Sequence, residues 1–94
     1  MKLKKGKEKG DYDYIFFCPG CNAEHGFWIV GNTVWGFNGN MDKPTVSPSI
    51  LHKVPLFDNT MHICHSYIIG GMIEYLSDCT HKLAGQTIEL PEIS

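Results

Sequence analysis

The chain has 94 residues, of which 43% are hydrophobic and 12% aromatic, and its formal net charge is −2. This length predicts a single domain, and the apolar content predicts a packed core and excludes general disorder. No apolar run approaches the roughly 18 residues that a membrane-spanning helix needs, and no export signal follows the basic start. We therefore expect a cytoplasmic protein without membrane contacts, whose cysteines stay reduced.

Charge is distributed unevenly along the chain. Residues 1–10 hold five of the eight Lys and one acid, whereas residues 11–94 hold three Lys and nine acids, and Arg is absent from the sequence. An acidic body without Arg is a poor surface for nucleic acid, so we expect at most weak phosphate contacts from the basic start. We predict a flexible basic tail over residues 1–11 and one domain over residues 12–94.

The aromatic and β-prone residues 12–17 predict a strand that leads directly into Cys18-Pro19-Gly20-Cys21. A second strand is expected over residues 27–30, so that the two strands form a hairpin with both thiols at its tip. A further short strand is expected over residues 33–37. Residues 42–50 contain two prolines and three hydroxyl side chains, which predicts an ordered extended segment whose Ser and Thr satisfy backbone groups locally. A strand interrupted by Pro55 follows.

Residues 61–69 and 72–78 flank Gly70-Gly71, a two-residue hairpin signal. With these glycines as the loop, Ile69 pairs with Met72, and alternation places Cys64 and Cys79 on one face and His65 on the other. The tail adds one last short strand, and no convincing amphipathic helix is found. The expected fold class is mostly β, a small antiparallel domain of hairpins with little or no helix.

The cysteine pattern predicts a metal site. The turn at Cys18 and Cys21 directs two thiols at one point, which suits tetrahedral Zn²⁺, and Cys64 with either Cys79 or His81 completes a set of four ligands. The competing interpretation is four reduced, partly buried cysteines without a metal. A thioredoxin-like redox pair is disfavoured, because the residues after Cys21 make a poor helix start.

Histidines suggest a catalytic alternative. His25, His65 and His81 are candidates for a cluster around an open metal, and an enzyme of this kind would use His25, His65 and Asp78 in catalysis. The default interpretation of a lone His is a hydrogen-bonded structural residue. The two Trp residues are expected in the core.

Five motifs occur in order: FxCPGC at 16–21, WGFNGN at 35–40, PTVSPSI at 44–50, CHSYI at 64–68 and DCTHKLAGQTIELP at 78–91. Together they resemble a family of small phage and prophage proteins with a domain of unknown function, whose members are often labelled "ammonia monooxygenase". The resemblance implies a phage-borne protein in a bacterial host cytoplasm but no monooxygenase chemistry. It also favours His81 as the fourth ligand after Cys18, Cys21 and Cys64, with Cys79 and His65 as alternates.

These observations predict a zinc-stabilised accessory protein that binds a host or phage protein. A zinc-dependent hydrolase with a His-lined open metal site is the first alternative. A nucleic-acid-binding zinc module is the second, and the missing Arg disfavours it.

Overall fold

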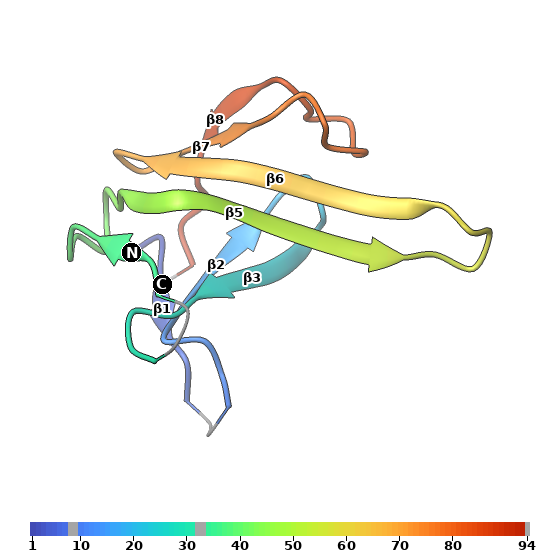
Figure 1. Cartoon of the computed structure of the whole chain (residues 1–94). Coiled ribbons are helices and arrows are strands. Elements are labelled where there is room, and N and C mark those ends of the chain that lie inside the picture. Colours follow the sequence, from blue (N-terminus) through green and yellow to red (C-terminus); the bar gives the residue numbers. More distant parts are fainter. Residues whose placement is uncertain (8–9, 32–33, 94) are drawn as a thin grey trace.

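Two antiparallel β-sheets make up the described part of the chain (Figure 1). The structure is a computed structural model, and it describes residues 1–7, 10–31 and 34–93. The three-stranded sheet has the order β1-β2-β3, and the five-stranded sheet has the order β4-β5-β6-β7-β8. The mostly β class is confirmed. The strands are β1 (Lys4–Lys5), β2 (Tyr14–Cys18), β3 (Ala23–Phe27), β4 (Gly36–Phe37), β5 (Val46–Pro55), β6 (Met61–Ile69), β7 (Met72–Tyr75) and β8 (Thr87–Glu89).

The hairpin about Gly70-Gly71 forms with the predicted register. Ile69 pairs with Met72, and the ladder continues as far as Ser66 opposite Tyr75. Both glycines have positive φ angles, 58° and 84°, which side chains disfavour. This register turns Cys64 and Ser66 into the protein, whereas the neighbouring His65 stands on the opposite face of the sheet.

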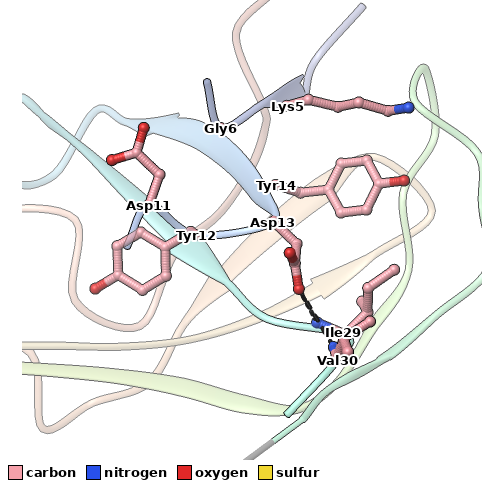
Figure 2. Close-up of a pocket in the computed structure, with 8 residues that line it drawn as sticks. All are labelled: Lys5, Gly6, Asp11, Tyr12, Asp13, Tyr14, Ile29 and Val30. Carbon is pink, nitrogen blue, oxygen red and sulfur yellow. Dashed lines mark hydrogen bonds between the residues drawn. The ribbon is translucent and has the colours of Figure 1, made fainter. Parts of the chain in front are cut away.

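The hairpin β2–β3 carries the two thiols at its tip, but its second strand begins earlier than residues 27–30. Asn22 has a φ of 53° and reverses the chain at once, so that Ala23 already pairs with Cys18. After β3, an Asp13 carboxylate oxygen accepts hydrogen bonds from the backbone N–H groups of Ile29 (2.8 Å) and Val30 (3.3 Å), as Figure 2 shows. These bonds fix the two residues outside the strand.

The start of the chain differs from the flexible tail expected over residues 1–11. Leu3 is fully buried, and Lys4 and Lys5 pair with Ile15 and Tyr14. Lys2 is also buried, and its Nζ atom donates to the carboxylate of Glu89 (2.7 Å) and to a backbone carbonyl (2.9 Å). Burial of Leu3, strand pairing by Lys4 and Lys5, and the bonds of Lys2 therefore tie residues 2–5 to the rest of the domain, whereas residues 8 and 9 of the expected tail lie outside the described residues.

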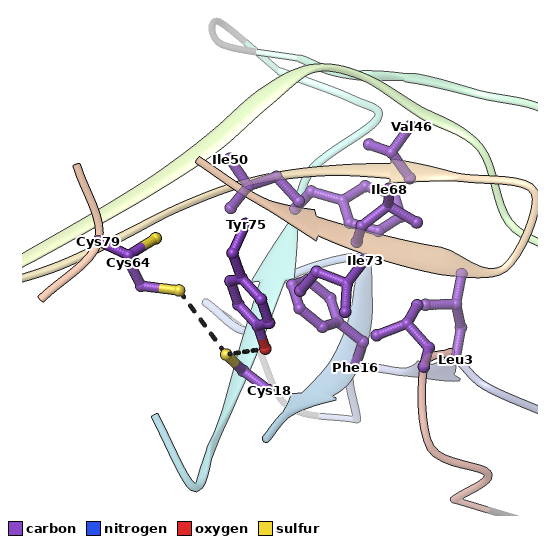
Figure 3. Packing of buried hydrophobic residues seen from close by; sticks show 12 residues of the cluster. Leu3, Phe16, Cys18, Val46, Ile50, Cys64, Ile68, Ile73, Tyr75 and Cys79 are labelled. Atoms are coloured by element: carbon purple, nitrogen blue, oxygen red, sulfur yellow. Dashed lines mark hydrogen bonds between the residues drawn. The ribbon is translucent and has the colours of Figure 1, made fainter. Parts of the chain in front are cut away.

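The core lies between the two sheets and contains side chains from both (Figure 3). Phe16 and Phe27 from the small sheet, and Ile68, Ile73 and Tyr75 from the large one, are almost fully buried. Trp28 and Trp35 are only partly buried, whereas the sequence placed both in the core. No helix in the described ranges is long and apolar enough to cross a membrane.

Candidate active site and metal-binding cluster

Three polar side chains form a hydrogen-bonded chain on the outer face of the five-stranded sheet. The Oγ atom of Ser49 lies 2.9 Å from Nε2 of His65, and Nδ1 of the same ring lies 3.0 Å from Oδ2 of Asp78. The His65 side chain is 24% exposed and that of Asp78 53% exposed, so solvent reaches the constellation. We call Ser49, His65 and Asp78 the triad.

The order of the three groups decides the direction of the hydrogen bonds. An ionised carboxylate only accepts, so Nδ1–H of His65 donates to Asp78. Nε2 then carries the lone pair and accepts from the hydroxyl of Ser49. This is the arrangement in which an imidazole removes the proton of a serine that attacks a carbonyl, and it is recognised by geometry because the order of the residues along the chain varies between folds.

Strand pairing brings the triad together. His65 pairs with Leu51, two residues beyond Ser49 on the same face of β5, which is a diagonal distance that a His side chain can span. Pairing between β5 and β6 shifts register between Val46 and Ile50, the stretch that contains Ser49. Irregularities of this kind redirect side chains and are frequent beside active sites.

Asp78 lies in the turn after β7, and the neighbouring Cys79 fastens that turn to β6. The Sγ atom of Cys79 accepts from the N–H of His65 and donates to its carbonyl, both at 3.2 Å. Further along, the N–H of Thr80 donates to the carbonyl of Ile63 (2.9 Å). The backbone on both sides of the Asp78–His65 contact is therefore fixed.

A second group of chemically active side chains lies on the inner face. The ligand atoms of Cys18, Cys21, His25 and Cys64 all lie within 4.8 Å of one another, and we call these four residues the thiol cluster. The Sγ atoms of Cys18 and Cys64 are 3.7 Å apart (Figure 3). Two thiolates bound to one tetrahedral zinc at about 2.3 Å would be about 3.8 Å apart, so the spacing fits a metal.

An unpaired nitrogen supports the same interpretation. Nε2 of His25 is buried without a hydrogen-bond partner among the described residues, and a buried polar atom left in this state is costly unless something binds it. The four cysteines form no disulfides. The donor set of three thiols and one imidazole is a common structural zinc site, and the residues present therefore fit a metal ion.

His81, the fourth ligand that the motifs favoured, belongs to a second group with Cys64 and Cys79, whose ligand atoms also lie within 4.8 Å of one another. Its ring packs against Gly20, where an added Cβ would overlap the imidazole, which explains glycine at this place in the turn. Nδ1 of His81 accepts from the N–H of Leu83 (3.2 Å), and its Nε2 is buried without a partner among the described residues.

The electrostatics of the thiol cluster favour a cation. A hydrogen bond with the Cys64 thiol lowers the pKa of Cys18 to about 3, and the same bond, together with burial, raises the pKa of Cys64. Burial and the Cys18 thiolate raise the pKa of Cys21 to about 11. Without a metal, the cluster therefore favours a single thiolate, and a divalent cation would supply the charge that deprotonates the others.

The structure thus divides the residues expected in one site between two. Cys18, Cys21 and Cys64 lie together with His25, whereas His65 and Asp78 lie in the triad on the other face. Sequence reasoning missed Ser49, which it treated as one of three hydroxyls that satisfy backbone groups. The sequence did hold one signal for Ser49: it lies in an extended segment that precedes a strand whose alternation turns His65 outward.

Fold and site together define a small two-sheet β domain with a Ser–His–Asp constellation on one face and a metal-capable cluster behind it. The family model described as "Bacterial ubiquitination-like system serine protease (BubE)" matches residues 2–76, and the chain belongs to this family. The matched range includes Ser49, His65 and the thiol cluster, whereas Asp78 lies two residues beyond it. No curated protein and no solved structure matches the chain.

Proposed function

We propose that the protein is a serine hydrolase that cleaves peptide-type acyl bonds, with Ser49 as nucleophile, His65 as general base and Asp78 as the carboxylate that orients the imidazole. The observation that carries the proposal is the continuous hydrogen-bonded chain of 2.9 Å and 3.0 Å from Ser49 through His65 to Asp78. The description of the family as a serine protease of a bacterial ubiquitination-like system supports a protein substrate.

The reaction follows from the geometry. The Oγ atom of Ser49 attacks the acyl carbon while its proton passes to Nε2 of His65, and Asp78 stabilises the imidazolium that forms. When the tetrahedral intermediate collapses, the carbon–nitrogen bond breaks and the amine leaves with the proton from Nε2. Water then attacks the acyl-enzyme, His65 again takes the proton, and free Ser49 and a carboxylic acid are regenerated.

We further propose that the thiol cluster binds a structural Zn²⁺, with His25 as the fourth ligand. The unpaired Nε2 of His25 is free to coordinate. By contrast, Nδ1 of neutral His81 accepts from the Leu83 N–H, which leaves the proton on Nε2 and makes that atom a poor ligand. When bound, the metal would supply folding energy by joining the hairpin β2–β3 to β6.

This assignment replaces the zinc-dependent hydrolase considered from the sequence. His65 is hydrogen-bonded to both Ser49 and Asp78, and in the described part of the chain neither His65 nor Asp78 belongs to a group of three or more His, Cys, Asp or Glu ligands within metal-binding distance. It also favours an enzyme over a purely binding accessory protein. Phage origin, cytoplasmic location and a dedicated protein partner stay predictions from the motifs.

The test is covalent labelling with an alkyl fluorophosphonate, whose phosphorus is attacked by an activated serine with loss of fluoride. We expect one adduct on wild-type protein, located at Ser49 by peptide mass mapping, and none on Ser49→Ala. Ser47→Ala is the matched control, because Ser47 is an exposed serine two residues away in β5, and it should label at the wild-type rate. Absence of labelling on wild type, or equal labelling of Ser49→Ala, would refute the proposal.

A further inference from the structure

Beside Ser49, the strand β5 has an edge that no strand of the described residues pairs with, and we infer that this edge binds the substrate as an extended peptide strand. The inference rests on the proposed serine hydrolase function and names its substrate geometry. Within the described ranges, β4 pairs only with Val46 and Ser47 of β5, so residues 50–55 have a paired strand on the β6 side alone (Figure 1).

Hydrogen bonding shows which backbone groups point outward. The carbonyl of His65 accepts from the N–H of Leu76, and the carbonyl of Ile63 accepts from the N–H of Thr80, both at 2.9 Å. In an antiparallel ladder, the N–H and C=O of one residue point to the same side, so His65 and Ile63 face away from β5. Their partners Leu51 and Lys53 are therefore non-hydrogen-bonded pairs, whose own N–H and C=O groups point to the open edge.

Ser49, the proposed nucleophile, lies on β5 itself and is the member of the triad nearest the open edge. Asp78 and His65 approach Ser49 from the β6 side, so an incoming carbonyl has access from the opposite side, along β5. The carbonyl of Ser49 itself accepts from Nε1 of Trp35 at 3.3 Å. The first backbone groups that can pair with a new strand are therefore those of Leu51, two residues after Ser49.

A cavity of about 100 Å³ adjoins the open edge and offers room for a side chain of the bound strand. Its lining residues include Leu51, Trp28 and Trp35, together with His25 of the thiol cluster. Both Trp residues are only partly buried. Aromatic walls of this kind bury large apolar area at little cost in side-chain entropy, which suits recognition of an apolar or aromatic residue.

The chemistry of the edge selects the occupant. Alternating donors and acceptors at the spacing of two residues are satisfied by an extended polypeptide, whose main-chain groups bind in the same alternation. Lys53 and Pro55 stand at the far end of the open stretch, and such residues limit pairing between copies of an edge strand. The occupant that we infer is thus an unfolded or C-terminal peptide segment of a substrate protein.

The experiment attaches a short strand to Ser49 and measures amide exchange on the edge. Acetyl-trialanine diphenyl phosphonate labels an activated serine through loss of phenol, and a small alkyl fluorophosphonate gives an adduct without a peptide. We expect the amides of Leu51 and Lys53 to exchange at least about tenfold more slowly in the peptide adduct than in the small adduct. The amide of His52, which faces β6, is the internal control and should not change.

The possible failures are distinct. No adduct with either reagent would refute the serine hydrolase function itself. An adduct with the small reagent but none with the peptide reagent, or a peptide adduct with unchanged exchange at Leu51 and Lys53, would overturn the edge inference alone. A third outcome is that, in unlabelled protein, the amides of Leu51 and Lys53 exchange more slowly as the protein concentration is raised. This would assign the edge to a second copy of the chain and would also overturn the edge inference.

Discussion

Replacing Asp78 by Asn tests the triad most directly, because it changes one hydrogen-bond role and almost no volume. The carboxylate accepts from Nδ1–H of His65 at 3.0 Å and so holds the tautomer in which Nε2 can accept the Ser49 proton. An amide in the same place can present its NH₂ group to Nδ1, which moves the ring proton to Nε2. That nitrogen then donates towards Ser49 and can no longer act as a base.

The size of the effect follows from the exposure of Asp78. The corresponding substitution in a triad with a buried carboxylate lowers the rate by about 10⁴, or roughly 5.5 kcal/mol of activation free energy. The side chain of Asp78 is 53% exposed, so water weakens its hold on the imidazole. We therefore expect Asp78→Asn to slow fluorophosphonate labelling of Ser49 by about 10²- to 10³-fold, below the limit for a buried group.

The assay is the second-order rate of Ser49 labelling, followed by intact-protein mass spectrometry. Asp58→Asn is the matched control, since Asp58 is an exposed Asp that accepts hydrogen bonds from Thr60 in the β5–β6 turn, far along the hairpin from the triad. It should label at the wild-type rate. If Asp78→Asn stays folded and keeps its labelling rate within about threefold of wild type, Asp78 does not orient His65 and the triad assignment is refuted.

Three further predictions concern the metal and the fold. His25→Ala and Cys18→Ser should each lose stoichiometric zinc and have a lower melting temperature, whereas His81→Ala should keep its zinc. Metal analysis combined with thermal unfolding checks this, and zinc retained by His25→Ala would reject His25 as a ligand. Phe16 is fully buried, so Phe16→Ala should lower the free energy of unfolding by about 3–5 kcal/mol in denaturant titrations, and a loss below about 1 kcal/mol would contradict the core described above. Hydrogen bonding and charge attraction from Lys2 lower the pKa of Glu89 from 4.5, so the ion pair stabilises the fold above pH 4.5 and its contribution is lost as the pH falls through the folded-state pKa. Glu89→Gln should therefore be less stable than wild type near pH 7, with the difference vanishing in acid, and a difference independent of pH would argue against this ion pair.

Local patterns predicted the β6–β7 hairpin because everything needed to form it lies within a few residues. The pair Gly70-Gly71 supplies the positive φ angles of the turn, and alternation along the strand then separates Cys64 from His65. Three of the expected metal ligands, Cys18, Cys21 and Cys64, lie together for a similar reason: the first two share one turn, and the third faces inward by the same alternation.

The remaining features depend on contacts between segments that are distant in the sequence. His25 joins the thiol cluster because β3 begins directly after Asn22. The positive φ of Asn22 makes this early start possible, and no apolar pattern in the sequence predicts it. Ser49 meets His65 through the register shift between β5 and β6, and such irregularities have no local signal. Leu3 anchors the first residues because it is fully buried in the common core, a tertiary effect that overrides the charged composition around it.

The thiol cluster and the triad are coupled through the backbone, because adjacent residues link the two faces of the sheet at Cys64–His65 and at Asp78–Cys79. Cys64 belongs to the thiol cluster, and its neighbour His65 belongs to the triad. Cys79 lies beside Cys64 (Figure 3), and its neighbour Asp78 contacts His65. Since adjacent residues of a strand point to opposite faces, whatever fixes Cys64 on the inner face also fixes the backbone that presents His65 outward. The Cys79 thiol also fixes this backbone, because it hydrogen-bonds to the N–H and the carbonyl of His65, both at 3.2 Å. In a chain of 94 residues with a small core, a bound metal would hold the outer face rigid enough for Ser49, His65 and Asp78 to stay aligned at its surface.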